Sequence, residues 1–130
     1  MTRADVDRWL DAYVAAWRSY DRGEIAALFS ADVSYRYRPH EEPIEGRDAV
    51  VDSWLGEGEL ADWSRDRDGT YDAEYRCVAV DGDVAVATGR SWYLIEPGGE
   101  VDEVFHNAFV MRFDAEGRCA EFTEWFMKAA

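Results

Sequence analysis

The sequence contains few of the residues that build metal sites and disulfide frameworks, and it has no apolar run long enough to span a membrane. Its 130 residues include two cysteines and two histidines. Cys77 and Cys119 form no CxxC pair, and His40 and His106 fit neither HxH nor HExxH spacing. We therefore expect reduced core thiols and no metal site.

Positive charge is also scarce. Lysine and arginine total 14 against 28 aspartates and glutamates, which gives a formal net charge of −14. Nucleic acids and anionic membranes bind through Lys and Arg contacts with phosphate, so neither is an expected partner. The first ten residues lack the apolar segment of a secretory signal, and we expect a cytoplasmic protein. Glycine-rich phosphate loops and a Ser/His/Asp arrangement are not evident, which disfavours nucleotide chemistry and acyl transfer to serine.

Apolar and aromatic residues, by contrast, are abundant. Hydrophobic residues make up 48% of the chain and aromatic residues 15%, including six tryptophans. A chain of this length buries roughly two-thirds of the surface that it exposes when unfolded. No linker, internal repeat or low-complexity tract divides it. We therefore expect one domain that spans residues 1–130.

The first half of the sequence reads mainly as helix. Apolar residues recur at spacings of three and four, which predicts an amphipathic helix over residues 3–20. A capping sequence at residues 21–24 introduces a short second helix that carries Ile25, Leu28 and Phe29. Alternation then predicts a strand over residues 33–38. A third helix starts at Gly46, after a proline-bounded loop.

The second half of the sequence reads as strands. Residues 57–70 are polar and are expected to form a lid or a long connection. Strands are predicted over residues 71–80 and 84–95, and a final hairpin over residues 101–128 turns at residues 114–117. Helices that precede an antiparallel meander predict an α+β domain with its helices on one face of a curved sheet. A sheet this long must curl, and its inward aromatic residues favour a cavity on the concave side.

Two polar residues interrupt the apolar faces of the final hairpin. Asn107 alternates with Phe105 and Phe109, and Glu124 alternates with Phe122 and Phe126. A carboxylate among aromatic rings either reaches water at the sheet edge or lies in a pocket.

The order of elements and three local sequences resemble a known superfamily. The sequences are YVAAWRSYDRGEIAALFSADVSY at 13–35, EGRDAVVDSWL at 45–55 and RFDAEGRCAEFTEWF at 112–126. Together they resemble the cone-shaped fold of nuclear transport factor 2 (the NTF2-like fold), ketosteroid isomerase and the SnoaL-like polyketide cyclases. The resemblance implies the order α-α-β-α-β-β-β-β and covers nearly the whole chain. It does not specify the chemistry, because this superfamily contains isomerases, dehydratases, cyclases, epoxide hydrolases and proteins without activity.

The catalytic residues of two branches can be sought in this sequence. The register of the resemblance puts Tyr13 on the oxyanion-donating tyrosine of the isomerases, but Tyr37 and Phe109 on the positions of their two acids. The epoxide hydrolases use an Arg-x-Asp pair, and here Arg90 is followed two residues later by Trp92. The resemblance therefore implies neither steroid-type isomerisation nor epoxide hydrolysis at those positions.

Glu124 remains as the candidate acid or base. In a pocket lined by rings, desolvation would raise its pKa toward the range useful for proton transfer. The alternative is that it reaches water or pairs with Arg90. Asn107 and Tyr13 complete the predicted catalytic set, either as groups that polarise a ligand oxygen or as satisfied structural residues. The predicted ligand-binding residues are aromatic: Trp17, Tyr35, Tyr37, Trp54, Trp92, Phe105, Phe109, Phe122 and Phe126.

Two classes of function stay open at this point. The first is a small-molecule pocket protein that acts as a cofactor-free isomerase, dehydratase, cyclase or hydratase on an apolar, oxygen-bearing substrate. The second is a non-catalytic domain that binds a hydrophobic ligand or a protein. We also expect a homodimer through the outer sheet face, where Val104, His106, Ala108 and Val110 alternate.

Overall fold

The structure, a computed structural model, describes residues 1–57 and 68–130, so the expected lid over residues 57–70 lies largely outside the described residues. The elements follow the predicted order, with one short additional strand, β2. The helices are α1 (Arg3–Ser19), α2 (Arg22–Ala27) and α3 (Arg47–Leu55). The strands are β1 (Phe29–Arg36), β2 (Ile44–Glu45), β3 (Tyr71–Asp81), β4 (Val84–Leu94), β5 (Val101–Phe113) and β6 (Cys119–Lys128).

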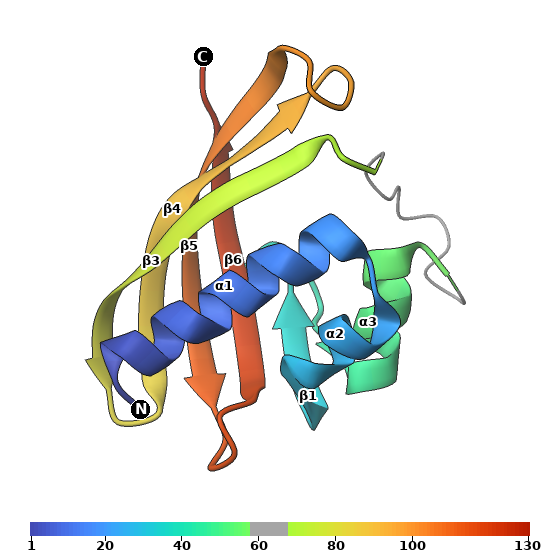
Figure 1. The fold of residues 1–130 in the computed structure, drawn as a ribbon. Coiled ribbons are helices and arrows are strands. Elements are labelled where there is room, and N and C mark those ends of the chain that lie inside the picture. Colours follow the sequence, from blue (N-terminus) through green and yellow to red (C-terminus); the bar gives the residue numbers. More distant parts are fainter. Residues whose placement is uncertain (58–67) are drawn as a thin grey trace.

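The strands form one curved sheet in the order β2-β1-β6-β5-β4-β3. Helix α1 crosses the concave face of this sheet, and α2 and α3 lie beside β1 (Figure 1). All pairings are antiparallel except that between β1 and β6, which is parallel and sets Tyr35 beside Phe122. This arrangement confirms the predicted α+β class and its cone-shaped, NTF2-like form.

Local capping explains where α1 begins and ends. The Thr2 hydroxyl accepts from the Asp5 backbone N–H at 3.1 Å, and the Asp5 carboxylate accepts from the Thr2 N–H at 2.9 Å. At the other end Tyr20 adopts a left-handed conformation with φ of 51°, so the helix stops one residue before the predicted limit. The indole N–H of Trp9 donates to the Leu28 carbonyl at 2.9 Å and ties α1 to the segment after α2.

The core lies between α1 and the inner face of the sheet. Both Cys77 and Cys119 are buried in or beside this core. Burial also raises the pKa of the Cys119 thiol, which keeps it protonated. Within the described ranges no helix is long and apolar enough to cross a membrane. The largest fully buried side chains are Trp54, Tyr35, Phe29, Phe109, Phe113, Phe122, Leu10, Ile25 and Met111.

Candidate active site

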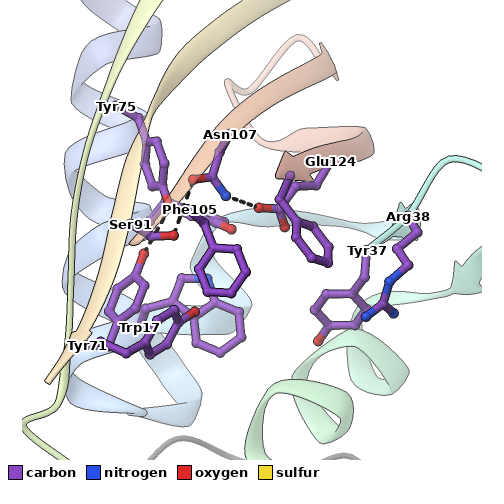
Figure 2. A pocket seen from close by; sticks show the side chains of 12 residues that line it. Trp17, Tyr37, Arg38, Tyr71, Tyr75, Ser91, Phe105, Asn107 and Glu124 are labelled. Carbon is purple, nitrogen blue, oxygen red and sulfur yellow. Dashed lines mark hydrogen bonds between the residues drawn. The ribbon is translucent and has the colours of Figure 1, made fainter. Parts of the chain in front are cut away.

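A cavity of about 180 Å³ opens between α1 and the concave side of the sheet. Its wall combines aromatic rings with a small number of polar groups, and Figure 2 shows how these side chains converge from α1, from the strands and from the segment after β1. The lining residues are Tyr13, Trp17, Tyr37, Arg38, Tyr71, Tyr75, Ser91, Tyr93, Phe105, Asn107, Glu124 and Phe126.

The polar groups form a chain of hydrogen bonds across three neighbouring strands. Ser91 on β4 donates its hydroxyl to Asn107 Oδ1 at 3.2 Å. Asn107 on β5 donates from Nδ2 to Glu124 Oε2 on β6 at 2.7 Å (Figure 2). Because Ser91 occupies the oxygen of the amide, it orients the nitrogen toward the carboxyl group. Ser91 is therefore a positioning residue for Asn107.

The register of the last hairpin explains why the carboxyl group points inward. Glu124 lies opposite Phe109, and Phe126 lies opposite Asn107. Alternate residues of a strand share one face, so Phe122, Glu124 and Phe126 all point to the concave side. The sequence left two placements of Glu124 open, water at the sheet edge or a pocket, and the structure places it among the residues that line the cavity.

The environment of Glu124 changes its acidity. Burial raises the pKa of this carboxyl group from 4.5 to about 7, and the hydrogen bond from Asn107 and the positive charge of Arg38 offset part of the rise. A carboxyl group with this pKa is protonated in part and ionised in part at neutral pH. It can therefore accept a proton in one step and return it in the next.

The tyrosines of the wall supply hydroxyl donors. Burial is the main cause that raises the pKa of Tyr13, Tyr37, Tyr71 and Tyr75, so all four phenols stay protonated at neutral pH. The Tyr71 and Tyr75 hydroxyls lie 3.4 Å apart on the side of the cavity that faces β3. The Tyr37 hydroxyl lies 2.8 Å from the Ser53 hydroxyl of α3.

Eleven of the twelve predicted site residues occupy two layers. Seven of them line the cavity: Glu124, Tyr13, Asn107, Trp17, Tyr37, Phe105 and Phe126. Tyr35, Trp54, Phe109 and Phe122 lie behind this lining as buried core rings. Tyr35 stacks on Phe122 with ring centroids 4.7 Å apart, and Trp54 stacks on Trp17 at 3.8 Å. These four rings support the wall and do not face the cavity.

Trp92 does not belong to the site, and its predicted ligand contact is wrong. It neighbours the inward-facing Ser91 on β4 and so points to the outer face, where the Arg90 guanidinium lies 5.9 Å from its ring. Arg90 itself pairs with Glu74 at 2.9 Å. The alternative in which Glu124 pairs with Arg90 is therefore also wrong.

Five lining residues were not among the predicted ones. Tyr71 and Tyr75 share one face of β3, and this alternation was visible in the sequence, as was the position of Ser91 on β4. Alternation over the predicted strand at residues 33–38 puts Arg38 on the face opposite Tyr37, but β1 ends at Arg36, so strand alternation does not apply at Arg38. Tyr93 completes this group. The two histidines are exposed.

The donor set of the described residues does not favour a metal. No group of three or more His, Cys, Asp or Glu side chains in residues 1–57 and 68–130 has metal-binding geometry. Glu124 is the only acid among the described lining residues, and a site for Zn²⁺ or Mg²⁺ requires several ligands.

The fold and the cavity together define a class: a cone-shaped α+β domain with a carboxyl group inside an aromatic pocket. The chain belongs to the SnoaL-like domain family, which matches residues 10–122. It is similar in structure to a candidate ketosteroid isomerase from Kribbella flavida DSM 17836, with a TM-score of 0.66 and 19% identity over 98% of this chain and 82% of the other. At this identity the likeness shows the fold alone. None of the curated proteins shows significant sequence similarity.

Proposed function

We propose that the protein is a cofactor-free acid/base enzyme of the isomerase, dehydratase, cyclase or hydratase type that acts on a small oxygen-bearing substrate. One observation carries the proposal. The Glu124 carboxyl group lies in an aromatic cavity, accepts a hydrogen bond from Asn107 at 2.7 Å and has a pKa of about 7. A group with these properties is suited to move a proton at neutral pH.

The proton transfers balance without any further reactant. Ionised Glu124 removes a proton from a carbon next to a carbonyl group, and the electron pair of that C–H bond moves into an enolate. The hydroxyl of Tyr13 or the second N–H of Asn107 stabilises the enolate oxygen by donating a hydrogen bond. Protonated Glu124 then returns the proton to another carbon, which isomerises the substrate, or to a departing hydroxyl group, which releases water.

Cyclohexanone in D₂O is a simple probe of this chemistry, because each removal and return replaces a proton beside the carbonyl with deuterium. Proton NMR measures the exchange as a loss of the signal from the protons beside the carbonyl. We expect wild-type exchange to increase with pH through about 7 as Glu124 ionises. The exchange rate of the Glu124→Gln variant should be lower by at least about a hundredfold, which is a typical contribution of one acid/base group.

Glu121→Gln is the matched control. Glu121 lies on the same strand, is exposed and pairs with Arg112 at 3.2 Å, so its variant makes the same Glu→Gln change without altering the cavity. This variant should exchange at the wild-type rate. Equal exchange by wild type and Glu124→Gln would remove the assignment of Glu124.

A second function, binding of a hydrophobic ligand without catalysis, is favoured by the large aromatic share of the wall. Eight of the lining side chains are rings, which bind apolar molecules without any reaction. Native mass spectrometry of the purified protein would detect a retained ligand. A retained molecule together with no Glu124-dependent exchange would support this alternative.

A further inference from the structure

The size of the cavity limits what it can enclose. A cavity of about 150 Å³ holds a benzene molecule, and this one measures about 180 Å³. It can therefore enclose one substituted six-membered ring. A fused four-ring skeleton would leave most of its atoms outside.

Arg38 gives the cavity one fixed positive charge. Of the twelve described residues that line the cavity, Arg38 is the only cation and Glu124 is the only acid. The Arg38 side chain is 45% exposed, which places it at the opening. Its guanidinium group lies 5.1 Å above the Phe126 ring and so is held beside the aromatic wall.

The existing ion pair of Arg38 leaves room for a ligand. Arg38 Nη1 lies 3.4 Å from Glu41 Oε1, well beyond the 2.7–2.9 Å of a strong charge-assisted bond. A guanidinium group has five N–H donors, and a carboxylate can accept two of them in parallel. A ligand carboxylate at the opening can therefore bind Arg38 without breaking a strong contact.

The charges near the site favour an anion over a cation. A cation inside the cavity would be attracted by the aromatic rings and by Glu124, but the positive charge of Arg38 at the opening would repel it. Glu124 is also already engaged by Asn107. The net charge of −14 repels anions at long range, but salt screens charges beyond about 8 Å at physiological ionic strength, so a direct pair with Arg38 is the contact that would select an anion at the opening.

We propose that the cavity selects organic anions that carry one ring or a chain of similar size, with their carboxylate paired to Arg38 and their apolar part among Trp17, Tyr71 and Phe105. This inference rests on the proposed function, because it places the reacting carbon of such an acid on the side of Glu124. It assigns the substrate to the class of small carbonyl-bearing carboxylic acids.

Three probes of equal ring size and different charge test the inference. Benzoate is an anion at pH 7, benzamide is neutral and benzylamine is a cation. Isothermal titration calorimetry should show that the wild-type protein binds benzoate at least about tenfold more tightly than benzamide, and binds benzylamine most weakly. A tenfold preference is the expected contribution of one partly exposed charge-assisted pair.

Substitution of Arg38 locates the preference. Arg38→Gln should bind benzoate and benzamide with equal affinity, and Arg38→Lys should restore part of the preference. Arg112→Gln is the matched control, since it removes the same charge from an exposed pair far from the cavity and should keep the preference.

Several outcomes would overturn the inference. Equal wild-type affinity for benzoate and benzamide would do so, as would an undiminished preference in Arg38→Gln or the absence of binding by all three probes at millimolar concentration. Tightest binding of benzylamine would assign the cavity to organic cations instead. The proposed function fails separately, if benzoate binds through Arg38 while cyclohexanone exchange does not depend on Glu124.

Discussion

The acidity of Glu124 couples the candidate chemistry to the stability of the fold. Its pKa is about 7 in the folded protein, compared with 4.5 for the unperturbed group. The folded state therefore binds this proton more tightly than the unfolded state does. Between pH 4.5 and 7 the contribution of Glu124 to the free energy of unfolding decreases as the pH increases, because ionising the buried group costs more than ionising the exposed one.

Glu124→Gln should therefore stabilise the protein at high pH. Glutamine keeps an oxygen that can accept from Asn107 and never ionises. We expect the variant and the wild type to have nearly equal free energies of unfolding near pH 4, and the variant to be more stable at pH 8 by at most about 3 kcal/mol. Urea unfolding across this pH range measures the difference. A difference that does not change with pH would contradict the raised pKa.

Individual residues were predictable where strand alternation applied to them. Asn107 and Glu124 were recognised because each is polar on a face of large aromatic residues, and both line the cavity. Arg38 was not recognised, because it follows the end of β1, where only three-dimensional structure decides the direction of a side chain. Trp92 was misplaced because aromatic character alone does not say on which side of a strand a residue lies.

Among the elements, the hairpin of β3 and β4 leaves no room for a side chain at Gly89. A Cβ atom on Gly89 would contact the Glu74 carbonyl oxygen and would lie 2.6 Å from Tyr75 Cδ1 and 2.7 Å from Tyr75 Cα. Since Tyr75 lines the cavity, this glycine allows β3 to approach closely enough to form the cavity wall.

Gly89→Ala should destabilise the protein by about 1–3 kcal/mol, the usual cost of overpacking. Urea unfolding measures this loss. Thr88→Ala, at the next and exposed position of β4, is the control and should change the stability by less than about 0.5 kcal/mol. An unchanged urea midpoint for Gly89→Ala would show that β3 and β4 shift apart to admit the methyl group at little cost in free energy.

Most elements were predictable because their periodicities are long. α1 and the four strands β3 to β6 repeat their pattern over ten or more residues. β2 has two residues, too few to create a pattern. The parallel pairing of β1 with β6 joins segments distant in the sequence, and local periodicity contains no information about such pairs.

For the whole molecule, the outer face of the sheet carries exposed apolar side chains. Trp125 lies opposite Ala108 and is 44% exposed, and Met127 lies opposite His106 and is 76% exposed. These two residues extend the row of outward-facing residues on β5, Val104, His106, Ala108 and Val110, from which the sequence predicted a dimer. We propose that a second copy of the chain covers this face, because an apolar patch this prominent favours burial.

Trp125→Glu should convert the dimer to a monomer, because it places a charge on the proposed contact. Sedimentation velocity at micromolar concentration measures this change. Ile95→Glu is the control: Ile95 is 61% exposed but lies outside the strands, so its variant should remain a dimer. Each protomer carries a charge of −14, so added salt should strengthen the association. A wild-type monomer under these conditions would refute the proposal.

The central position of β6 in the sheet also determines when the site can form during folding. β6 comes last among the strands in sequence, yet it lies between β1 and β5. β1 can pair locally with β2, but its pairing with β6 joins residues roughly 90 positions apart, and contacts of such long sequence separation slow folding. Because Glu124 is on β6, its carboxyl group becomes buried only when this strand inserts. We therefore expect Glu124 to acquire its raised proton affinity when β6 pairs with β1, so that a change in that affinity would report this long-range step of folding.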